Sequence, residues 1–137
     1  MNNVQDKMNL NGRLAVLTGA TGNIGKVVAR RRAGRGAELV LLGLPASPLA
    51  QLKDELASFS RGSIDFSPCD LEDGAQRQAS VNALLASGRP VSVLVNNAAF
   101  VGTSDLQGWA VPFAEQQVDT WRRAIEVNLT AVFDLCQ

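Results

Sequence analysis

A glycine-rich segment over residues 18–25 constrains the fold of this chain more than any other feature. It reads Thr-Gly-Ala-Thr-Gly-Asn-Ile-Gly and lies between an apolar run, Arg13–Thr18, that predicts a strand and a helical pattern over Asn23–Ala33. Glycine at such a turn allows a sharp bend, close approach of the backbone to a pyrophosphate, and tight packing of helix on strand. The helix N-terminus then offers free N–H groups to the phosphates. A plain glycine-rich connection is the alternative, and the strand-to-helix context favours the phosphate site.

The rest of the chain alternates short apolar runs with longer helical patterns, which predicts βαβ units and a parallel sheet. The further expected strands are Glu38–Leu42, Ser63–Ser67 and Val91–Val95. The further expected helices are Leu49–Phe59, Asp73–Ser87 and Trp121–Cys136. A long irregular stretch, Phe100–Gln116, precedes the last helix and is a candidate for shaping a substrate mouth. The order β-α-β-α-β-α-β-α predicts one α/β domain over residues 1–137.

Each helix is expected to bury one apolar face. On the first helix Ile24, Val28 and Arg32 recur at spacings of four, so Arg32 is expected toward the sheet, with its guanidinium reaching past the helix end. Strand Val91–Val95 is apolar enough to be buried on both faces. The expected buried side chains of the two later helices are Val81, Leu84 and Leu85, and then Ile125, Leu129, Val132 and Phe133.

Composition excludes several kinds of function. The 13 basic and 13 acidic residues cancel, so no nucleic-acid or membrane-surface partner is expected. The chain has no histidine, which excludes a Ser-His-Asp triad, a Cys-His pair and a histidine-ligated metal. Cys69 and Cys136 have no zinc-like spacing and predict reduced thiols in the cytoplasm. No apolar run approaches the length of a membrane span, and the N-terminus lacks the apolar core of a signal peptide.

Two further motifs lie where ligands bind in parallel sheets, beyond the carboxyl ends of strands, and a third lies within the last helix. Asn96-Asn97-Ala98-Ala99 follows the fourth strand, and its small alanines leave room for a ring or a ribose. Asp70-Leu71 follows the third strand, where a carboxylate could bind an adenine edge or instead cap the next helix. Asn128 interrupts the last helix, which indicates a specific hydrogen bond, a water held in a kink, or a solvent-facing residue.

Together and in this order, these four motifs resemble the short-chain dehydrogenase/reductase family from Leu10 to Cys136. The resemblance implies a doubly wound Rossmann-type sheet, binding of NAD or NADP, and hydride transfer between the cofactor and a carbonyl or alcohol. The resemblance assigns the pyrophosphate turn to Gly19, Thr21, Asn23, Ile24 and Gly25. It assigns the adenine site to Asp70 and Leu71. Asn96 and Ala98 correspond to the strand-four motif that steadies the sheet and lines the ribose. Asn128 is similar to the asparagine that holds a water in the family's proton relay.

The chain departs from the family pattern at two places. Asn23 replaces a glycine, while Gly22 supplies one a residue earlier, which gives the TGxxGxxG spacing of the extended branch that includes nucleotide-sugar epimerases. Asparagine tolerates a left-handed backbone, so the turn remains compatible with the family. Gly43 lies where an acid would bind the ribose of NAD, and Leu44 where an arginine would often accept the phosphate of NADP, so the choice of cofactor stays open.

The resemblance also implies a catalytic Ser and a Tyr-x-x-x-Lys motif beyond Asn128, and the chain contains no tyrosine. We therefore expect this chain to be the cofactor-binding N-terminal half of an oxidoreductase, with an incomplete sheet. On its own the chain is expected to be inactive, and to be unstable or to self-associate. The expected partners are a dinucleotide and a small-molecule substrate, and the complete protein is expected to be a homo-oligomer. The alternatives are a nucleotide-sugar epimerase or dehydratase, a non-catalytic dinucleotide-binding module, and a purely structural domain that binds no cofactor.

Overall fold

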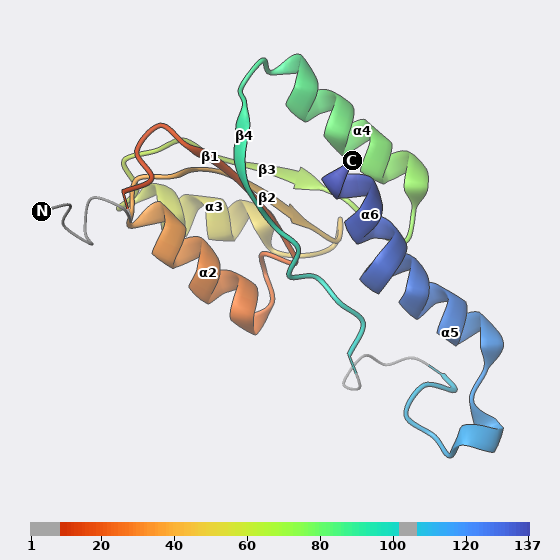
Figure 1. Ribbon diagram of the computed structural model, residues 1–137. Helices are drawn as coiled ribbons and strands as arrows, with labels where there is room; N and C mark the ends of the chain where they lie inside the picture. Colours follow the sequence, from red (N-terminus) through yellow and green to blue (C-terminus); the bar gives the residue numbers. More distant parts are fainter. Residues whose placement is uncertain (1–8, 102–106) are drawn as a thin grey trace, which may run out of the picture.

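The computed structural model describes residues 9–101 and 107–137, and it contains a four-stranded, all-parallel sheet (Figure 1). The strands are β1 (Leu14–Thr18), β2 (Glu38–Gly43), β3 (Ile64–Pro68) and β4 (Val91–Val95), in the spatial order β3-β2-β1-β4. The helices are α2 (Asn23–Ala33), α3 (Leu49–Ala57), α4 (Gly74–Ala86), α5 (Val118–Ile125) and α6 (Ala131–Cys136), with a π-helical turn at Glu126–Thr130. The predicted doubly wound α/β class is confirmed.

The two faces of the sheet bury two separate apolar clusters, because side chains alternate along each strand. One face packs Ala15, Leu17, Leu39 and Leu41 against α2 and α3. The other packs Leu14, Val16, Val40 and Leu42 against residues of α4, the π-helical turn and α6. Figure 1 shows these helix groups on opposite sides of the sheet. From β1 the chain adds β2 and then β3 on one side of β1. It then returns through α4 and adds β4 on the other side of β1, so the strand order reverses between β1 and β4.

Helix α2 has the predicted bounds, but its predicted face is only partly buried: Val28 packs against the first apolar cluster, and Ile24 does not. Ile24 is 70% exposed, whereas the buried residues are Gly25, Ala29 and Ala33. These small residues also recur every four positions, and they let the helix lie closer to the sheet than a row of larger side chains would. Arg32 is half-buried beside that face.

The predicted faces of the later helices are only partly buried. On α4 the buried residues are Arg77 and Ser80, and Leu84 packs against the second apolar cluster, while Leu85 is exposed. The last helical segment begins at Val118 rather than Trp121 and buries Thr120, Ala124, Val127 and Ala131. Its expected face is largely outward: Ile125, Leu129 and Phe133 are exposed. Small and polar residues therefore form many of the contacts, and several of the larger apolar side chains remain on the surface.

Strand β4 is not buried on both faces as its composition suggested. Val91 and Ser92 are exposed, and Val93 to Val95 are half-buried. The strand is an edge of the described sheet and pairs with β1 alone. The irregular stretch after it extends beyond the described residues at 102–106, and its later part forms a short 3-10 turn at Phe113–Glu115.

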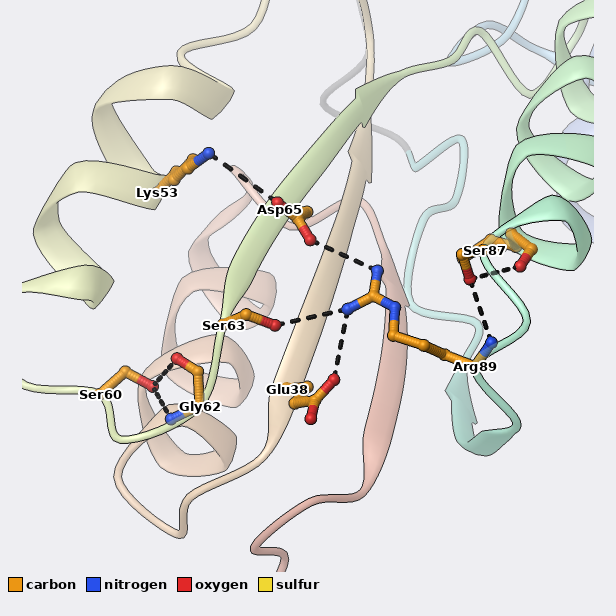
Figure 2. Close-up of polar contacts among 9 residues, drawn as sticks. Glu38, Lys53, Ser60, Gly62, Ser63, Asp65, Ser87 and Arg89 are labelled. Carbon is orange, nitrogen blue, oxygen red and sulfur yellow. Dashed lines mark hydrogen bonds and ion pairs between the residues drawn. The ribbon is translucent and has the colours of Figure 1, made fainter.

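A charged cluster joins the start of β4 to the other strands at the N-terminal edge of the sheet (Figure 2). The guanidinium of Arg89 lies 3.2 Å from Glu38 Oε2 at the start of β2 and 3.4 Å from Asp65 Oδ2 in β3. Lys53 Nζ on α3 lies 3.9 Å from the other oxygen of Asp65. Arg89 therefore links segments on both sides of β1, at the edge opposite the carboxyl ends of the strands.

In the described parts of the chain, every helix is too short or too polar to cross a lipid bilayer.

Candidate functional site

A cavity of about 680 Å³ lies at the carboxyl ends of the strands. Its size is within the range of cofactor and ligand pockets. The described residues that line it come from the glycine-rich turn, the ends of β2, β3 and β4, and the π-helical turn: Gly19, Thr21, Gly22, Asn23, Ile24, Gly25, Leu42, Gly43, Leu44, Ser47, Cys69, Asp70, Leu71, Asn97, Ala98, Ala99, Phe100, Val101 and Val127. The topology therefore brings most of the predicted site residues together.

The glycine-rich turn has two positions where only glycine fits. Gly19 has φ +63°, and a Cβ there would lie 2.8 Å from Cα of Ala98. A Cβ on Gly25 would overlap the carbonyl oxygen of Gly19. The backbone at Gly19 thus packs directly against the loop after β4, and it also packs directly against the first turn of α2 at Gly25. Asn23 opens α2 without a positive φ, so the turn does not use the tolerance of asparagine for a left-handed backbone, and Gly19 is the left-handed residue.

The start of α2 is suited to an anion. The first N–H groups of an α-helix have no partner inside the helix, and the cap residue, Gly22, has no side chain to accept from them. No acidic residue lies in the first turn of α2. Asn23, Ile24 and Gly25, which carry these N–H groups, all line the cavity. These donors and the space kept free by glycine fit a pyrophosphate group.

The floor of the cavity is a hydrogen-bonded joint between β1 and the loop after β4. Thr18 Oγ1 accepts from the backbone N–H groups of Asn97 and Ala98, both at 3.0 Å. The side-chain amide of Asn97 donates to the carbonyl oxygens of Thr18 at 3.1 Å and Gly19 at 3.2 Å. The sheet-steadying contact expected of Asn96 is therefore made by Asn97. Asn96 is exposed and points its amide toward Cys136 Sγ, 3.6 Å away.

Asp70 and Leu71 lie at the other end of the cavity, after β3. Asp70 Oδ1 accepts from the N–H of Glu72 at 2.9 Å, which holds the carboxylate at the cavity wall. The cap of α4 is Asp73, which accepts from the N–H groups of Ala75 and Gln76. The capping alternative for Asp70 is thus taken by another aspartate. Among the described residues that line the cavity, Asp70 is the only charged one.

Gly43 closes β2 where the cofactor's ribose was expected. A Cβ at Gly43 would lie 3.0 Å from Ser47 Oγ and 3.3 Å from the Leu49 side chain, which is tight but leaves room for adjustment. Leu44 is exposed at the cavity mouth. Neither residue supplies a charge that would select one dinucleotide over the other.

Asn128 lies in the π-helical turn and forms two hydrogen bonds with one backbone unit. Its Oδ1 accepts from the N–H of Phe100 at 2.8 Å, and its Nδ2 donates to the carbonyl oxygen of Phe100 at 3.2 Å. Of the alternatives for Asn128, the specific hydrogen bond is present, and the residue lies in a π-turn. Asn128 is itself exposed, and its contact is with the loop after β4 rather than with a buried partner. Its part in a proton relay remains a prediction.

Sequence reasoning gave three groups no role at this site. Thr18 and Asn97 lay inside the glycine-rich segment and the strand-four motif, but the hydrogen bonds that they form between β1 and the loop after β4 were not predicted. Cys69 lines the cavity, and burial raises the pKa of its thiol, so the thiol is protonated at neutral pH. In residues 9–101 and 107–137 no group of three potential ligands that could hold a metal was found.

Comparisons with known proteins agree with this geometry. Residues 13–137 match the model of the family described as short chain dehydrogenase. The chain is 33% identical over 125 residues to a hexahydroindene-carboxyl-CoA reductase of Mycobacterium tuberculosis, covering 90% of this chain and 45% of that protein. It is 33% identical over 125 residues to a short chain dehydrogenase/reductase of Macrophomina phaseolina, covering 91% of this chain and 68% of that protein. A metagenomic short-chain oxidoreductase solved in complex with NADP superposes with a TM-score of 0.80 at 30% identity, covering 92% of this chain and 54% of that one. The chain thus spans about half to two thirds of the length of these relatives.

Proposed function

This chain belongs to the short chain dehydrogenase family, and on that premise we propose that it is the NAD(P)-binding part, over residues 1–137, of an oxidoreductase acting on a carbonyl or alcohol. The observation that carries the proposal is the uncapped start of α2 beside the glycine-rich turn, open to the cavity. The relatives support it: one is named as a reductase, and one was solved with NADP. The nicotinamide, when bound, exchanges a hydride with the substrate.

Each wall of the cavity has a separate task in this proposal. The N–H groups of Asn23, Ile24 and Gly25 hold the pyrophosphate, and Thr21 contributes to the same turn. Asp70 and Leu71 hold the adenine, and Gly43 adjoins its ribose. Asn97, through Thr18, fixes the wall formed by Ala98 beside the second ribose. The chain has no tyrosine, so a phenolic proton donor would come from residues outside this chain.

The epimerase alternative loses its main support in the structure. It depended on the position of Gly22, yet Gly22 has φ −70° and ψ 168°, which any residue can adopt. A Cβ on Gly22 would lie 3.3 Å from the Gly19 carbonyl oxygen, a tight but adjustable contact. The spacing of the glycines therefore does not mark a different turn, and we propose the oxidoreductase function alone.

Titration with NADH and NADPH tests the proposal directly. We expect saturable binding, followed by the rise in nicotinamide fluorescence, and competition by adenosine diphosphate, because the pyrophosphate and adenine contacts are made by this chain. Since neither Gly43 nor Leu44 carries a charge, the two affinities should agree within about tenfold, or ~1.4 kcal/mol. A folded chain, judged by circular dichroism, that shows no saturation with either nucleotide contradicts the proposal.

We further propose that the protein is cytoplasmic and self-associates through α5 and α6. Trp121, Ile125, Leu129 and Phe133 recur every four residues and are all exposed, and large apolar patches of this kind mark contact surfaces. Sedimentation should show concentration-dependent association that Leu129→Glu weakens. Leu85→Glu, at a similarly exposed leucine on α4, is the matched control and should leave association unchanged. Equal effects of the two substitutions would assign the association to another surface, such as the edge of β4.

A further inference from the structure

Arg77 on α4 is the most deeply buried charged side chain in the described residues, at 5% exposure. Its Nη2 lies 2.7 Å from Glu126 Oε1 and 2.7 Å from Asp134 Oδ2, and its Nε donates to the same Asp134 oxygen at 2.8 Å. Its Nη1 donates to the carbonyl oxygen of Leu71 at 2.5 Å. A buried guanidinium is tolerated only when its donors are paired in this way. Nothing in the cavity described above uses Arg77 directly.

The two carboxylates reach one guanidinium because of the π-helical turn between them. In a regular α-helix each residue turns by about 100°, so residues eight apart would differ by roughly 80° around the axis. A π-turn absorbs one extra residue. Glu126 begins the π-turn, and Asp134 lies eight positions later in α6. With one residue absorbed, their directions differ by only roughly 20°, in the opposite sense. The π-turn therefore brings both carboxylates to nearly the same side of the helix, where Arg77 contacts them.

The π-turn that Arg77 contacts forms part of one wall of the cavity. Val127, in the π-turn, lines the cavity, and Asn128, next to it, holds both polar groups of the Phe100 backbone. Phe100 lines the cavity from the loop after β4. Through its bond to Leu71, Arg77 also holds the wall that follows β3. Three separate segments around the cavity are thus joined, directly or through Asn128, by one side chain behind them.

We propose that Arg77 is a positioning residue for dinucleotide binding, which acts by holding the π-turn in the register that places Asn128 on Phe100. This inference rests on the proposed function. The guanidinium is suited to the task because it presents donors in a fixed fork, whereas a lysine ammonium is a point charge on a flexible stem. Arg77→Lys should therefore keep the positive charge but no longer hold the π-turn in the register that places Asn128 on Phe100.

The first test measures the register without any nucleotide. In Arg77→Met, which removes the charge and retains much of the side-chain volume, we expect the N–H of Phe100 to exchange with solvent about tenfold faster, since its hydrogen bond to Asn128 is weakened. The N–H groups of Leu39 and Leu41 in the central strand serve as internal references. Arg30→Met removes an exposed ion pair with Glu55 between α2 and α3, and as the matched control it should not change exchange at Phe100.

The second test separates positioning from general stability. NADPH affinity should fall by about tenfold in Arg77→Met and in Asn128→Ala, and the double variant should be no worse than Asn128→Ala, because both changes act through the same contact. Additive losses would show that Arg77 affects binding independently of Asn128 and overturn the proposal. If Arg77→Met does not fold, Glu126→Gln and Asp134→Asn replace it, because these partners are half-exposed. A wild-type chain that binds no nucleotide would contradict the proposed function, while unchanged Phe100 exchange would contradict the role of Arg77.

Discussion

Gly25→Ala is expected to eliminate measurable NAD(P)H binding and to lower the free energy of unfolding by about 2–3 kcal/mol. A methyl group at this position would overlap the Gly19 carbonyl oxygen and approach Cα of Ala20. Helix α2 cannot move away to relieve the overlap, because Ala29 and Ala33 on the same face are fully buried against the sheet. The first turn of α2 would therefore shift, and the N–H groups proposed to hold the pyrophosphate would shift with it.

Urea unfolding and nucleotide titration measure the two parts of this prediction. Gly22→Ala is the matched control in the same turn, since its backbone is ordinary and its methyl group would meet only a 3.3 Å contact. It should cost less than about 1 kcal/mol and weaken binding only slightly. A Gly25→Ala protein that binds as tightly as the wild type would show that α2 does not form the pyrophosphate site.

Thr18→Val is expected to lower the free energy of unfolding by about 2–4 kcal/mol. Thr18 is 1% exposed, and its hydroxyl accepts from the N–H groups of both Asn97 and Ala98. Valine has nearly the same shape but accepts nothing, so two backbone donors would lose their partner. Each such loss costs about 1–3 kcal/mol where water cannot replace the bond.

Thr18→Ser is the control for this second prediction. Serine keeps the hydroxyl and loses one methyl group, so the expected cost is about 1 kcal/mol. NAD(P)H affinity should follow the same order, with threonine and serine close together and valine much weaker, because the joint places Ala98 at the cavity wall. Equal unfolding energies for the valine and serine variants would show that the hydroxyl does not hold β1 to the loop after β4.

Local backbone requirements made much of the fold predictable. The glycine-rich turn needs glycine at Gly19, which has a positive φ, and at Gly25, where a Cβ would overlap the nearby Gly19 carbonyl oxygen. Both requirements arise within the turn itself, so they are visible as a spacing of glycines in the sequence. For the same reason α2 and β4 begin and end at the predicted residues. The parallel order followed from strands alternating with helices, since parallel neighbours need a crossover.

The buried faces of α2, α4 and the last helical segment were predicted less well, for a physical reason. Apolar periodicity marks where large side chains recur, yet the tightest contacts of α2 use Ala29 and Ala33, and those of the last segment use Ala124 and Ala131. Small residues allow close packing without standing out in a hydrophobic pattern. The exposed apolar side chains on α5 and α6 were consequently assigned to the core.

The sequence by itself determined the glycine-rich turn, the parallel α/β order and the four motifs that meet at one edge of the sheet. Only the tertiary structure decided which of two adjacent asparagines joins the strands, and that Arg77 pairs with Glu126 in the π-turn, 49 residues away in the chain. The first set depends on backbone geometry within a few residues. The second depends on which side chains meet once distant elements pack, and their chemistry alone does not specify the partner.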